Sequence, residues 1–108
     1  MQAHTPTFYD RLAARQPGMM QALDALGVAV RGAGPLDDKT VQLVQLAGAA
    51  AARSEGAVHS HVRRARAAGA TADEIRHALI ALVSTIGFPQ VVAALTWAED
   101  QLAPDSPL

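Results

Sequence analysis

The sequence contains no cysteine, and this absence excludes several kinds of chemistry. Without a thiol the chain cannot form a disulfide, use a thiolate nucleophile or bind a metal through sulfur. No apolar run reaches the length of a membrane span, and the N-terminus lacks a signal-peptide pattern. The net charge of −1 gives no general attraction to nucleic acid or to anionic membranes. We therefore expect a cytoplasmic protein with neither nucleic acid nor membrane as a partner.

Aromatic residues are also scarce, at 4% of the 108 residues, whereas half of the residues are hydrophobic and alanine dominates among them. Small side chains allow helices to pack closely but form a thin core, which self-association often supplements. We expect a single domain over residues 1–108, with its core in 17–102 and loose ends at 1–5 and 104–108. Small residues around Ala65 and Ala68, and the alanine-rich segment 47–52, are predicted to permit close contacts in a homo-oligomer.

The apolar residues recur at helical spacing, and no segment shows the alternation of a strand. The pattern predicts an all-α helical bundle of about six helices. Asp37 is a plausible N-cap for a helix that runs to about Arg53. Thr71-Ala72-Asp73-Glu74 reads as a capping box, followed by apolar residues at helical spacing as far as Ile86. Pro89 suits the first turn of a last helix that reaches Leu102.

The segment from Ser54 to Thr71 holds the main candidate for a functional residue, His61. At 100° per residue, His61 falls in the middle of a face of small apolar residues. A buried imidazole needs a hydrogen-bond partner, and Gln42 on the preceding predicted helix can supply one. Desolvation should then hold the pKa of His61 below that of a free histidine. The residues predicted to share this face are Ser54, Ala57, Val58, His61, Ala65 and Ala68.

This segment resembles the core of the carboxymuconolactone decarboxylase and alkylhydroperoxidase D-like family. Redox members typically read Cys-x-x-Cys-x-x-x-His here and carry a glutamate on the preceding helix. His61 falls on the motif histidine, Ser54 and Ala57 fall on the two cysteines, and Gln42 falls on the glutamate. Further similarity lies in Leu36-Asp37-Asp38-Lys39-Thr40, Ala68-Gly69-Ala70-Thr71 with Asp73-Glu74-Ile75, and Gly87-Phe88-Pro89.

The resemblance implies an alkylhydroperoxidase D-like helical fold assembled as a trimer or a hexamer. It also invites a peroxiredoxin or alkylhydroperoxidase label, which the residues do not support. That mechanism needs a thiolate and a proton-exchanging partner, and three of the four positions hold Gln42, Ser54 and Ala57.

Decarboxylase members of the family also lack the cysteine pair and keep a histidine near this position. The first interpretation is therefore a protein that binds a small carboxylated or cyclic organic molecule near His61, with non-redox, lyase-type acid–base chemistry. Gln42, Ser54 and Ala57 would line the site, and Arg64 is a weak candidate for the cation that holds a carboxylate. The alternative is a non-catalytic binding or structural homo-oligomer, in which His61 is hydrogen-bonded within the core and Ser54 is an N-cap.

No cofactor and no metal site are predicted. His59 and His61 point about 200° apart on a helix, so they cannot hold one ion together. Glu55 and His59 lie one turn apart and could bind a metal across subunits, but a solvated polar pair is the favoured interpretation.

Overall fold

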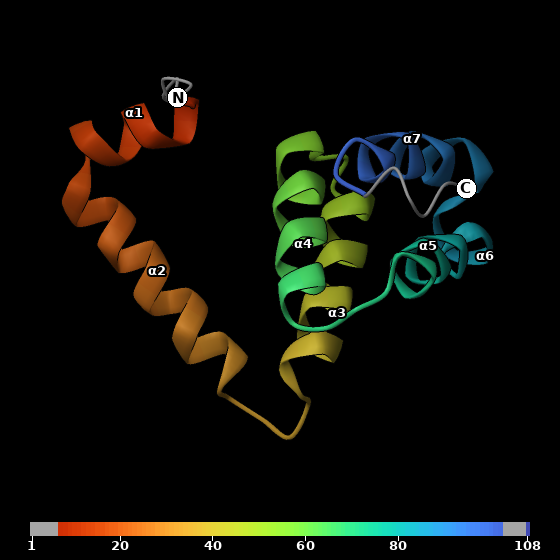
Figure 1. The fold of residues 1–108 in the computed structure, drawn as a ribbon, viewed down its shortest axis with the longest axis horizontal. Helices are drawn as coiled ribbons and strands as arrows, with labels where there is room; N and C mark the ends of the chain where they lie inside the picture. The colour runs from red at the N-terminus through yellow and green to blue at the C-terminus, as the bar shows by residue number, and fades with distance from the viewer. Residues whose placement is uncertain (1–6, 103–107) are drawn as a thin grey trace, which may run out of the picture. The chain divides into compact units, whose positions relative to one another are not determined.

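The computed structural model describes residues 7–102 and Leu108, and in these residues every regular element is a helix (Figure 1). The all-α class is therefore confirmed. No helix in the described part of the chain is both long enough and apolar enough to cross a membrane. The contacts divide the chain into two units, residues 1–35 and 36–108, which are described separately. The predicted single domain over 1–108 stays a prediction, and most of its predicted loose ends lie outside the described residues.

The first unit contains α1 (Phe8–Arg15) and α2 (Pro17–Arg31). Thr7 begins α1 with a capping box, and Pro17 occupies the first turn of α2, where its missing N–H has no cost. Met20 is the one buried residue in these two helices. The large apolar side chains that remain exposed in them are those of Phe8, Tyr9, Met19, Leu23, Leu26, Val28 and Val30.

The second unit contains α3 (Asp38–Ala51), α4 (Glu55–Ala67), α5 (Ala72–Ile80), α6 (Val83–Ile86) and α7 (Phe88–Glu99). A three-residue connection joins α3 to α4, so the two helices lie side by side as an antiparallel pair (Figure 1). Their inner faces pack with α5 and α7 around one core. The largest fully buried side chains of that core are Leu46, Val58, Val62, Ile75, Leu79 and Val91.

The helix boundaries follow the local signals in the sequence. The Asp37 carboxylate accepts a hydrogen bond from the Thr40 amide at 2.8 Å, which confirms the predicted N-cap of α3. Thr71 and Glu74 form the predicted capping box at the start of α5. Gly69 ends the preceding turn with a φ of +98°, a conformation that glycine adopts without strain.

Two expectations about the second unit are wrong in detail. The helix predicted to run as far as Ile86 breaks after Ile80, where the Leu82 amide bonds to the Leu79 carbonyl, three residues back instead of four. The tighter turn redirects the chain, and Val83 becomes exposed. Ala65, predicted to serve subunit contacts, is fully buried in the chain's own core, so it is not available for another copy.

Candidate functional site

Helices α3 and α4 bring together the two polar residues on which the sequence interpretation rests. The His61 Nδ1 atom lies 3.1 Å from the Oε1 atom of Gln42, and Gln42 is only 4% exposed. The predicted hydrogen bond between these residues is therefore confirmed. It links two helices across 19 positions of sequence, so the imidazole orientation is set by helix packing.

This hydrogen bond determines which ring nitrogen of neutral His61 carries the proton. A carbonyl oxygen only accepts hydrogen bonds, so with Gln42 Oε1 as the partner the hydrogen must be on Nδ1. The second ring nitrogen, Nε2, then keeps its lone pair and can accept a proton. Because an amide does not titrate, Gln42 holds this arrangement without adding a negative charge.

The pKa of His61 is lowered from the ordinary value of 6.5, first because burial disfavours the charged imidazolium and second because of the positive charge of Arg64. The expected direction is thus confirmed. At neutral pH the ring is uncharged, which suits a general base. Arg64 itself is exposed, and its guanidinium makes no hydrogen bond or ion pair with a described residue, so it can receive an anion.

His61 is partly buried, but the most deeply buried stripe of α4 differs from the predicted face. The buried residues of the helix are Val58, Val62 and Ala65, at the i, i+4 and i+7 positions of one stripe. His61 lies beside this stripe, not at its centre. The buried stripe holds Val58 and Val62, the two large apolar residues of α4, whereas the predicted face left Val62 out.

Ser54 and Ala57 have structural roles. The Ser54 Oγ atom accepts a hydrogen bond from the Ala57 amide at 3.3 Å, which confirms Ser54 as the N-cap of α4. Ala57 is half-buried and packs against the core. No hydrogen bond joins Ser54 to His61 among the described residues. A serine nucleophile activated by His61 is therefore not formed in this structure.

One pocket among the described residues does not include His61 in its wall. It has a volume of about 270 Å³ and is lined by Arg53, Pro89, Gln90, Ala93 and Trp97, so neither His61 nor Ser54 belongs to it. Arg53 adopts a φ of +57°, which is uncommon for a residue with a side chain. Its guanidinium lies 3.4 Å from Gln90 Oε1 at the pocket wall. Trp97 packs against the core and also forms part of this wall.

The sequence interpretation missed an ion pair between α5 and α7, in which the arginine is buried and the glutamate is half-buried. Arg76 is 5% exposed and donates two hydrogen bonds to the Glu99 carboxylate, at 2.6 and 2.9 Å. The guanidinium lowers the pKa of Glu99 through these hydrogen bonds. A signal existed in the sequence, because Ala72, Ile75, Arg76 and Leu79 form one i, i+3, i+4, i+7 stripe, with a charged residue in it.

Comparison with known proteins gives one match. The sequence model of the carboxymuconolactone decarboxylase family matches residues 17–100, which is most of the chain. No curated protein and no solved structure matches significantly. The matched range contains Gln42, Ser54, Ala57 and His61.

Proposed function

Because the chain belongs to the carboxymuconolactone decarboxylase family, we propose that it binds a small carboxylated or cyclic organic molecule beside His61 and carries out acid–base chemistry on it. The observation that carries the proposal is the Gln42–His61 hydrogen bond, which leaves a neutral, oriented imidazole with a free acceptor nitrogen.

Two further groups on the same helices can contact such a ligand. The Arg64 guanidinium, whose charge already acts on His61, would pair with the carboxylate of the ligand. The Oε1 atom of Gln45, one turn along α3 from Gln42, is buried and has no hydrogen-bond partner among the described residues. A ligand hydroxyl that donates to this oxygen would remove the cost of leaving it unpaired.

For a decarboxylation, the residues would act as follows. The bond between the carboxylate and its carbon breaks, carbon dioxide leaves, and the electron pair stays on the carbon as an enolate conjugated with a neighbouring carbonyl. His61, which has first taken a proton from solvent water on Nε2, then donates this proton to that carbon and returns to the neutral form. The lowered pKa of His61 makes the imidazolium a stronger acid, although a less populated one at neutral pH.

The direct test is incubation of the protein with carboxymuconolactone, the compound in the family's name, and with the same lactone without the carboxylate. We expect saturable binding of the acid alone, measured by calorimetry, and release of carbon dioxide if the chemistry is complete. Binding without turnover would favour a binding protein. Absence of both would favour the structural alternative and contradict this proposal.

Thiol peroxidase activity is the alternative that the residues exclude. Reduction of an alkyl hydroperoxide by the family's thiol mechanism needs a thiolate, and the chain has no cysteine. We expect the metal-free protein, supplied with a dithiol donor, to consume hydroperoxide at the rate of a heat-denatured control. Consumption clearly above that control would contradict the assignment to non-redox chemistry.

We also propose that the protein is a homo-oligomer, a trimer or a hexamer. The support is the set of apolar side chains on α1 and α2 that these two helices do not bury against each other, which another copy of the chain would cover. Light scattering coupled to gel filtration at micromolar concentration should give three or six times the monomer mass. A monomer mass under these conditions would refute this proposal.

A further inference from the structure

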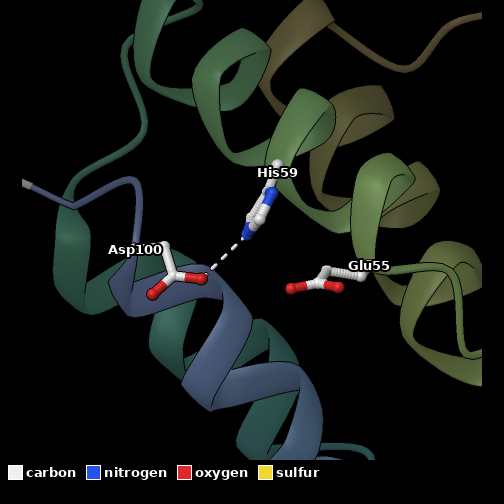
Figure 2. A group of neighbouring side chains, drawn as sticks. All are labelled: Glu55, His59 and Asp100. Atoms are coloured by element: carbon white, nitrogen blue, oxygen red, sulfur yellow. Dashed lines mark hydrogen bonds and ion pairs between the residues drawn. The ribbon is translucent and has the colours of Figure 1, made fainter. Parts of the chain in front are cut away.

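Three side chains with metal-binding atoms meet where the start of α4 faces the end of α7. They are Glu55 and His59, one turn apart on α4, and Asp100, the C-cap residue of α7 (Figure 2). One ligand atom from each lies within 4.8 Å of the others. The sequence interpretation considered Glu55 and His59 as a solvated pair, because Asp100 lies 41 positions beyond His59 and nothing local links them.

Only two of the three side chains in this cluster are joined by a hydrogen bond. His59 Nε2 lies 2.9 Å from Asp100 Oδ2, and the Glu55 carboxylate points toward the same space without a hydrogen bond to a described residue (Figure 2). The two carboxylates repel each other at this distance. Arg63, one turn further along α4 than His59, donates a hydrogen bond to the Gln101 amide oxygen and to neither carboxylate of the cluster.

Asp100 lies at the C-terminal end of α7, and this position makes the electrostatic potential around the cluster more negative. A helix C-terminus carries a partial negative charge, so a carboxylate there is electrostatically unfavourable, whereas a cation is favourable. The Asp100 side chain, which is 54% exposed, nevertheless lies against His59, whose side chain is 24% exposed. A divalent cation between the three side chains would offset the repulsion of both carboxylates and the helix end.

We propose that Glu55, His59 and Asp100 form a binding site for a divalent transition-metal ion, with zinc as the best match. One imidazole nitrogen and two carboxylate oxygens form a mixed set that suits zinc better than magnesium or calcium, which prefer oxygen alone. With bond lengths of 2.0–2.2 Å, ligand atoms around tetrahedral zinc lie about 3.3–3.5 Å apart. The exposed Glu55 side chain can close the remaining distance by changing its rotamer, and water would complete the coordination.

Such an ion would join the start of α4 to the end of α7. It would hold in place the helix that carries His61, but it would not contact His61, which points to a different side of α4. The site is therefore separate from the function proposed above. Its main effect would be on stability, because an ion that binds the folded state alone shifts the folding equilibrium toward it.

The test is a zinc titration of the full-length protein after treatment with a chelator, by calorimetry and by competition with a chromophoric chelator. We expect one zinc per chain and a higher midpoint of thermal unfolding with zinc. His59→Ala should weaken binding by more than about tenfold, the lower limit for loss of even an outer-shell partner of a metal ligand. The thermal shift should disappear in the same variant.

Matched variants distinguish the loss of the metal site from the loss of another histidine or of folded structure. His77→Ala removes an exposed histidine from α5 and His61→Gln alters the proposed functional site, and both should bind zinc like the wild type. Asp100→Asn provides a second test of the site if His59→Ala loses helical content by circular dichroism. Cobalt(II) should give visible absorption bands in the wild type that are lost in both site variants. Equal zinc binding by the wild type and the site variants, or no stoichiometric binding by the wild type, would overturn the proposal.

Discussion

Replacing His61 with glutamine is expected to abolish binding and turnover of a small carboxylated ligand while leaving the helical content nearly unchanged. Glutamine can still form a hydrogen bond with Gln42, and His61 is only half-buried, so the packing of α3 against α4 should survive. The variant cannot, however, exchange a proton near neutral pH. Calorimetry with carboxymuconolactone and far-ultraviolet circular dichroism measure the two effects separately.

His77→Gln is the matched control, since His77 is exposed on α5 and is not part of the site. This variant should bind and convert the ligand like the wild type. Wild-type activity in His61→Gln, with His77→Gln also unaffected, would show that His61 has only a structural role. A loss of helical content in His61→Gln would mean that its contact with Gln42 is needed for folding.

Replacing Glu99 with glutamine is expected to give a large loss of stability, on the order of 2 kcal/mol in the free energy of unfolding. The neutral amide cannot replace both charge-assisted hydrogen bonds from the nearly buried Arg76 guanidinium. Urea unfolding followed by circular dichroism measures the change. Asp73→Asn is the matched control, because the exposed Asp73 carboxylate approaches the same arginine only to 3.6 Å, and it should change stability little.

The ion pair between Arg76 and Glu99 should also affect how stability depends on pH. Arg76 lowers the pKa of Glu99 in the folded state, so the unfolded state binds the proton more readily. The contribution of the pair is present above the ordinary pKa of a glutamate and is lost as the pH falls through the lowered folded value. Glu99→Gln lacks this component, so its stability should approach that of the wild type in acid. A constant difference at all pH values would contradict the assignment.

The sequence predicted the features that depend on local interactions. The caps at Asp37, Ser54 and Thr71 and the proline at the start of α7 each act within one turn, and each is found where expected. The Gln42–His61 hydrogen bond was predictable because the resemblance to the family matched the two residues to motif positions on facing helices.

Features that depend on packing between distant segments were not predicted. The buried stripe of α4 is an exception, because its two large apolar residues, Val58 and Val62, already mark it in the sequence, and the predicted face left Val62 out. The long side chain of Arg76 is buried because it forms an ion pair with Glu99, which lies 23 positions away in the sequence. The approach of Asp100 to His59 likewise depends on how α7 packs on α4.

The state of the His61 ring is the central element of this account, and nitrogen-detected NMR of imidazole-labelled protein measures it directly. We expect a pKa below the ordinary value of 6.5 and, above it, a neutral ring with the proton on Nδ1. In the matched variant Gln42→Glu, the added carboxylate should raise the His61 pKa relative to the wild type. A wild-type pKa at or above 6.5, or a neutral ring protonated on Nε2, would contradict the account.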